Sequence, residues 1–203
     1  MSPRRITKRE MKEDKLVTTA FKLSEWIQKH LNQVLMVAGG VVLVAIVVFF
    51  IFSSKAKRNQ KAAELFGKAT LEFQTGNASQ AITNLHTVME KYGRTKDAGQ
   101  ATFYLATVYF YAKDYARSQA IFQRFVEKYK DENPLLLASA QAGIAECQME
   151  NREFQTAGDN FVKAVSSKPD GFLAPQYLFS AGRAYLKANQ KERAKEVFKR
   201  LID

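Results

Sequence analysis

Few side chains in this sequence are of the types that perform catalysis or bind metals. The 203 residues include two histidines, His30 and His86, and a single cysteine, Cys147. No group of Cys, His and Asp has metal-ligand spacing, no glycine-rich loop is placed to hold a phosphate, and no nucleophile stands in a catalytic motif. The sequence therefore predicts a non-enzymatic protein with no metal and no cofactor.

The cysteine lies in a stretch with helical apolar periodicity, among Ile144, Ala145 and Met149. This position favours a buried, inert thiol over a reactive one, because reactive thiols need an exposed and electropositive setting. A single cysteine also excludes an intramolecular disulfide.

The longest apolar stretch runs from Val34 to Phe52 and contains no charge and no proline. As a helix it spans roughly 28 Å, close to the hydrocarbon thickness of a bilayer. Trp26 precedes it where amphipathic aromatic rings favour the headgroup layer. A buried core helix and a cleaved signal peptide are the alternatives, but signal-peptide cores are only about 7–15 residues long, and no A-x-A site follows here. The sequence predicts an uncleaved signal-anchor, a transmembrane helix over 34–52.

The segment 1–33 is basic and has a helical pattern of its own. Thr7 and Glu10 fit a capping box, in which each side chain bonds the other residue's backbone. Apolar residues then recur at three- and four-residue steps while lysines lie elsewhere: Leu16, Ala20, Leu23, Ile27 and Leu31 against Lys12, Lys15, Lys22 and Lys29. This pattern predicts an amphipathic helix that lies on a membrane surface or docks on the cytoplasmic surface of a partner.

The net charge of +11 is spread along the chain rather than clustered. Residues 1–52 hold eight Lys or Arg against four Asp or Glu, so +4 belongs to this region. No nucleic-acid-binding motif accompanies the basic residues, and we expect no nucleic acid partner; anionic lipid headgroups account for the basic charge. Because short segments orient a span more than long domains do, the basic N-terminal segment favours a cytoplasmic N-terminus.

From residue 56 to 203 the apolar pattern is helical throughout, and it repeats. Four segments align on a small residue that follows a polar turn, with spacings of 37, 39 and 37: Ala81, Ser118, Ala157 and Ala194. A matching helix precedes each one and carries its own small residue where two helices cross closely: Ala69, Ala106, Ala145 and Gly182. Tyr109 and Tyr185 follow three positions later in the second and fourth segments. The repetition predicts four helix pairs.

This pattern resembles the tetratricopeptide repeat, which has a small residue and an aromatic on its first helix and Ala-x3-Phe on its second. The first segment departs from the family, with Glu72 where an aromatic is usual. The resemblance implies an all-α, right-handed solenoid of about four helix pairs, near 60–95, 98–133, 136–170 and 173–203. The spacing exceeds the family's usual length of about 34, so the links between pairs are expected to be longer, and each link has a Gly or Pro to stop a helix.

A tetratricopeptide solenoid presents a concave surface formed by its first helices. The family's inward-facing positions imply a protein-binding groove that includes Phe66, Phe73, Phe103, Phe110, Phe179 and Arg183. Five phenylalanines are more than a solvated groove should expose, which is typical of a binding site; the alternative is that these rings pack between neighbouring repeats. The Lys and Asn residues of the carboxylate clamp found in chaperone-binding members are missing. The apolar face of the last helix is expected to be covered by a partner, by self-association as a homo-oligomer, or by residues beyond Asp203.

The predicted function is that of a scaffold or chaperone-like adaptor held close to a membrane. A short inner segment, one span and a repeat domain resemble the ancillary subunit of the bacterial Sec translocon. That family implies a single-pass inner-membrane protein with a cytoplasmic N-terminus and a periplasmic repeat domain, whose partners are the translocon and periplasmic chaperones. Two other interpretations remain open: a repeat domain that faces the cytosol as a receptor or adaptor, and a component of envelope assembly.

Overall fold

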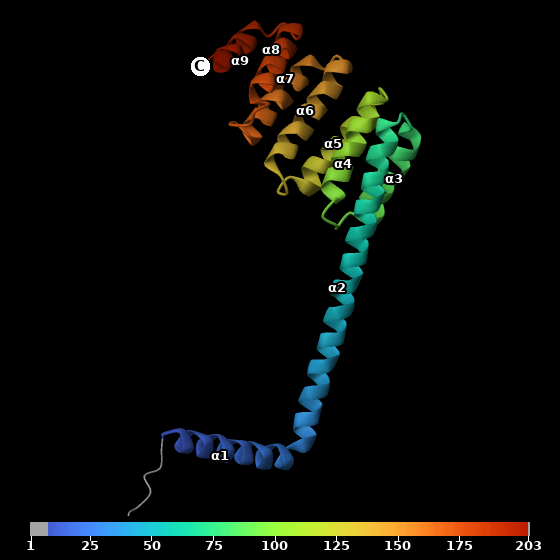
Figure 1. Ribbon diagram of the computed structural model, residues 1–203. Coiled ribbons are helices and arrows are strands. Elements are labelled where there is room, and N and C mark those ends of the chain that lie inside the picture. Colours follow the sequence, from blue (N-terminus) through green and yellow to red (C-terminus); the bar gives the residue numbers. More distant parts are fainter. Residues whose placement is uncertain (1–7, 203) are drawn as a thin grey trace, which may run out of the picture. The chain divides into compact units, whose positions relative to one another are not determined.

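The computed structural model describes the backbone of residues 8–202 and the side chains of residues 17–202 (Figure 1). All regular elements in this range are helical, which confirms the predicted all-α class. In chain order they are α1 (Lys8–Lys29), α2 (Leu31–Gln74), α3 (Ala78–Lys91), α4 (Ala98–Tyr111), α5 (Tyr115–Tyr129), α6 (Pro134–Glu150), α7 (Phe154–Ser167), α8 (Ala174–Lys187) and α9 (Lys191–Ile202). The Thr7 end of the predicted capping box lies outside the described residues.

The chain divides into two compact units, one up to Ser54 and one from Lys55 onward. In the first unit, α1 occupies the region where the sequence predicts an amphipathic helix. Its end is marked by His30, whose N–H donates to the Trp26 carbonyl at 3.0 Å and whose ring stacks on the indole at a centroid distance of 4.9 Å. These contacts close the last turn of α1 before α2 begins at Leu31.

The helix α2 runs without a break from Leu31 to Gln74 and contains the apolar stretch. Every side chain from 35 to 52 is exposed. Among the described residues, α2 is the one helix that is long and apolar enough to cross a membrane. No part of its most apolar segment is buried. The stretch is therefore not a core helix of this chain.

In the second unit the helices form four successive pairs: the C-terminal part of α2 with α3, α4 with α5, α6 with α7, and α8 with α9. Three buried clusters hold them together, and each joins helices that follow one another in the chain. The small residues predicted at the helix crossings are all buried, with Ala69, Ala106 and Ala145 fully inaccessible. This arrangement confirms the predicted tetratricopeptide-like solenoid.

Gly182 shows why the crossings need small residues. A Cβ atom at this position on α8 would lie 2.4 Å from the Phe198 ring on α9. The Phe198 ring fills the space in front of the Gly182 backbone, so a side chain at this position would displace the ring. The Gly at the predicted crossing position of the fourth pair thus makes room for a side chain of its own second helix.

The turn inside each pair has one geometry. A residue with positive φ ends the first helix, and the next N–H donates to the carbonyl five residues earlier, as in a Schellman motif. The positive-φ residues are Gly76 (85°), Lys113 (60°), Arg152 (63°) and Asn189 (59°). The bonds are Asn77 to Glu72 (2.7 Å), Asp114 to Tyr109 (2.9 Å), Glu153 to Gln148 (2.8 Å) and Gln190 to Tyr185 (2.8 Å). These positions recur at 37, 39 and 37 residues, the spacing predicted from the small residues.

One link differs from the prediction. Pro134 does not stop α5; it is the first residue of α6. The Asn133 side chain accepts hydrogen bonds from the N–H groups of Leu135 (2.9 Å) and Leu136 (3.3 Å) and caps the helix. A proline suits this position because the first residues of a helix have no intrahelical use for their N–H groups.

Candidate protein-binding groove

Two of the predicted groove residues pack between the first and second helix pairs. The Phe66 and Phe73 rings of α2 both meet Tyr104 of α4 edge-on, each at a centroid distance of 5.9 Å. Both phenylalanines are half-buried. Their contacts fit the alternative prediction, in which the rings join neighbouring repeats.

Phe103 belongs to the core of its own pair. Its ring lies 5.4 Å from Phe122 and 5.9 Å from Phe125, both on α5. It packs in the cluster that joins α4, α5 and α6. Of the other predicted groove residues, Phe110 packs against the same cluster.

The end of α4 carries a more open group of rings. Phe110 is half-buried and contacts Tyr115 at 5.4 Å, while Tyr111 contacts both Phe110 (6.1 Å) and Phe73 (6.0 Å). Tyr111 is 69% exposed. Sequence reasoning missed Tyr104 and Tyr111, yet the pair has the same seven-residue spacing as Phe66 and Phe73, which places each pair on one helix face.

The last two predicted groove residues lie on the exposed face of α8. Phe179 is 49% exposed, and its ring approaches Phe198 at 6.1 Å. The Arg183 guanidinium lies 5.9 Å from the Phe179 ring centroid, within reach of a cation–π contact. Of the six predicted residues, these two are classed as exposed.

Arg183 also borders a pocket of about 130 Å³ between α6, α7 and α8. Carboxylates, cations and two apolar side chains line this pocket. The lining residues are Glu146, Met149, Glu150, Phe161, Ser180, Arg183 and Lys187. Burial raises the pKa of Glu146, and the nearby Arg183 charge only partly opposes this effect. A pocket with both signs of charge is suited to peptide groups and charged side chains.

Other chemistry finds no support in the described residues. No three His, Cys, Asp or Glu side chains among residues 17–202 are grouped to hold a metal ion. The Cys147 thiol is buried, donates to Ser118 Oγ at 3.3 Å, and has a pKa raised mainly by burial. A high pKa keeps the thiol protonated and unreactive.

The comparison with protein families decides the classification. The model of the tetratricopeptide repeat-like domain matches residues 24–203, most of the chain. The chain belongs to the tetratricopeptide repeat-like domain family. No curated protein matches the chain.

Solved structures agree with this family at the level of fold. A crystal structure of MamA has 21% identity and a TM-score of 0.58, with 73% of this chain and 80% of that chain covered. The apo form of RapI has 18% identity and a TM-score of 0.63, with 77% and 61% covered. BtubC from P. vanneervenii has 12% identity and a TM-score of 0.60, with 69% and 61% covered. At these identities the likeness shows the fold alone.

Within the tetratricopeptide repeat-like domain, the first helices therefore present two kinds of surface. The rings of Phe66 and Phe73 on α2 make contacts between repeats, and those of Phe103 and Phe110 on α4 contact the second helix of their own pair. The face of α8 exposes an aromatic ring beside a guanidinium and a charged pocket, the combination that protein interfaces favour. The tetratricopeptide repeat-like fold suggests that the domain binds other proteins.

Proposed function

We propose that this protein is a membrane-anchored scaffold without enzymatic activity, whose tetratricopeptide repeat-like domain binds other polypeptides. The observation that carries the anchor is the exposed apolar surface of α2 from 35 to 52, where large side chains such as Phe49, Phe50 and Phe52 are each more than 60% exposed. Exposing an apolar surface of this extent to water is unfavourable, and soluble proteins rarely do so. A lipid bilayer covers it, and a helix satisfies its own backbone there.

The proposed site of action is the outer face of the bacterial inner membrane. The basic segment ahead of the span supports a cytoplasmic N-terminus, because positive charge in a short flanking segment resists translocation. The repeat domain then faces the periplasm. In this place a polypeptide-binding scaffold serves as a chaperone-like partner of the protein translocon and of periplasmic chaperones.

Protease accessibility tests the topology. Intact spheroplasts and lysed spheroplasts are treated with protease, and a tag after Asp203 reports on the repeat domain. Cleavage in intact spheroplasts is expected, with a cytoplasmic marker protein left whole as the control. Protection until lysis would place the repeats in the cytoplasm, end the proposal of a translocon partner, and favour a cytosol-facing adaptor.

Site-specific crosslinking tests the binding surface. A photoreactive phenylalanine analogue replaces Phe179 on α8, and a matched chain carries it at Lys163, an exposed position on α7. The proposal expects crosslinks to translocon subunits or emerging chains from position 179 and few from position 163. Equal crosslinking from both positions would show that α8 has no special role.

A further inference from the structure

The last described helix pair has an open apolar groove. It measures about 540 Å³ and lies between α8 and α9, lined by Leu186, Lys191, Ala194, Lys195, Phe198, Lys199 and Ile202. Leu186 is 50% exposed and Ile202 is 86% exposed. Apolar side chains exposed together in this way mark a surface that has a partner.

The repeat register shows what kind of element fits the groove. At the position of Phe198, the three earlier pairs have Leu85, Phe122 and Phe161, which are 0%, 4% and 1% exposed. Phe198 is only half-buried. In the earlier pairs the first helix of the next pair packs against the second helix, as α8 packs against α7. The groove therefore has the shape that receives an α-helix.

A row of lysines distinguishes this groove from its equivalents. Lys191, Lys195 and Lys199 lie at successive four-residue steps on α9 and line the groove. The nine equivalent positions in the earlier second helices are uncharged side chains or a histidine: Ala78, Ile82, His86, Tyr115, Gln119, Gln123, Phe154, Gly158 and Val162. At Gly158 an added Cβ would meet the Tyr185 ring of α8 at 2.4 Å, so this row faces the next helix.

We propose that the groove binds an amphipathic α-helix of a partner protein, with an apolar stripe flanked by Asp or Glu at four-residue steps. None of the three lysines has a carboxylate partner within the described part of the chain, so all three are available for pairing. An acidic row on the incoming helix matches the lysine row in spacing, and the apolar stripe fills the groove. A second copy of this chain is a poor occupant, because a symmetric contact would bring two lysine rows together.

Binding of designed peptides to the full chain in zwitterionic nanodiscs tests this proposal. The probe is a fluorescent helical peptide with a Leu stripe and Glu at i, i+4 and i+8. One control peptide has Lys in place of these Glu residues, and a second has the same composition in scrambled order. Anisotropy is read against empty nanodiscs. The acidic probe is expected to bind at least tenfold more tightly than either control.

Matched variants locate the binding. The triple change K191E/K195E/K199E turns three favourable pairs into three repulsive ones and should weaken the acidic probe by roughly tenfold or more. The control K96E/K130E/K163E changes the net charge equally at exposed positions away from the groove and should leave binding unchanged. Ile202→Glu, at a side chain 86% exposed, should also weaken binding without unfolding the domain.

Four results would overturn the proposal. Equal binding of the ordered and scrambled acidic probes would reduce the effect to bulk charge, and so would equal losses in the two triple variants. No binding of the acidic probe would mean that the lysine stems, or residues that follow Asp203, cover the apolar face. A dimer by sedimentation in detergent that Ile202→Glu converts to a monomer would assign the groove to a second copy.

Discussion

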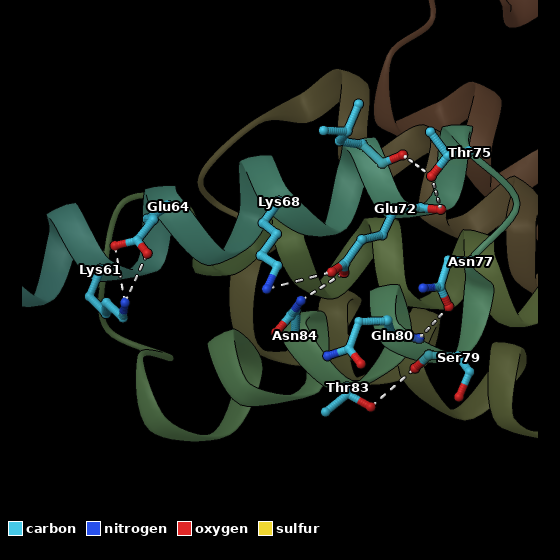
Figure 2. Close-up of polar contacts among 11 residues, drawn as sticks. Lys61, Glu64, Lys68, Glu72, Thr75, Asn77, Ser79, Gln80, Thr83 and Asn84 are labelled. Carbon is cyan, nitrogen blue, oxygen red and sulfur yellow. Dashed lines mark hydrogen bonds and ion pairs between the residues drawn. The ribbon is translucent and has the colours of Figure 1, made fainter.

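Asn84 on α3 donates a hydrogen bond through Nδ2 to Glu72 on α2 at 2.7 Å (Figure 2). The same contact recurs two pairs later, where Asn160 Nδ2 donates to Gln148 at 2.8 Å. In the second and fourth pairs, tyrosines take the place of Glu72 and Gln148 and lie under arginines, Arg117 over Tyr109 at 4.8 Å and Arg193 over Tyr185 at 4.1 Å. The four repeats thus alternate between a polar pair and a tyrosine–arginine pair, and Glu72 is part of this alternation.

Removing the carboxylate of Glu72 should destabilise the first pair. Glu72→Ala leaves the Asn84 amide, which is only 8% exposed, without its acceptor. A buried donor without a partner costs about 1–3 kcal/mol. Glu72→Gln keeps an acceptor and is the matched control, with an expected loss of less than about 1 kcal/mol. Chemical unfolding of the full chain in detergent measures both, and equal losses would contradict this role of the hydrogen bond.

Glycine should stabilise the turn after α4. Lys113 has a φ of 60°, a region that costs a side chain-bearing residue about 1 kcal/mol and costs glycine little. Lys113→Gly is therefore expected to raise the free energy of unfolding by up to about 1 kcal/mol, less the entropy that glycine adds to the unfolded chain. Gly76→Ala, at a φ of 85°, is the opposite change and should lower it by about 1 kcal/mol or more. Changes of the same sign would contradict the prediction.

A side chain at Gly182 should force α8 and α9 apart. Gly182→Val places methyl groups where an added Cβ already lies 2.4 Å from the Phe198 ring. Overpacking of this kind costs roughly 1–3 kcal/mol. The double variant Gly182→Ala with Phe198→Leu makes room for a methyl group and should recover part of the loss of Gly182→Ala alone. Additive losses in thermal unfolding would show that the ring is not the obstacle.

Glu146 should make stability fall as pH rises. Its pKa is raised above the ordinary 4.5 by burial, so the folded chain holds this proton more tightly than the unfolded chain does. The stabilising effect of the proton is complete below pH 4.5 and is lost as pH rises through the folded pKa. Glu146→Gln removes this dependence, and its melting temperature relative to the native chain should increase from pH 4 to pH 7. A constant difference over this range would contradict the raised pKa.

Much of the fold follows from local sequence rules. The small residues at the crossings and their spacing of 37, 39 and 37 follow from the close packing of adjacent helices, so both are visible in the sequence. The apolar stretch is visible from its composition alone. The continuity of α2 is harder to predict. No Gly or Pro separates the span from the first repeat, so the residue types neither mark a helix boundary there nor exclude one. The turn residues Lys113 and Arg152 are also hidden, since their backbone conformation is set by hydrogen bonds rather than by residue type.

The candidate groove was less predictable than the fold. The family's inward-facing positions identify a helix face, but two neighbouring helices compete for that face. Phe103 packs against α5 and Phe66 packs against Tyr104 of α4, whereas Phe179 is 49% exposed. Which ring remains free depends on the size of residues on other helices, and a single position does not reveal it.

The common turn of the four pairs has a consequence for how such a chain grows. In every pair the same backbone conformation, closed by the same hydrogen bond, joins the two helices, and three of the four turns use residues other than glycine. A DNA segment that encodes the residues from one turn to the next can therefore be duplicated or deleted in frame, and the new junction reproduces a turn that already exists. Evolution can lengthen or shorten this domain in whole steps of 37 or 39 residues, without inventing a new join.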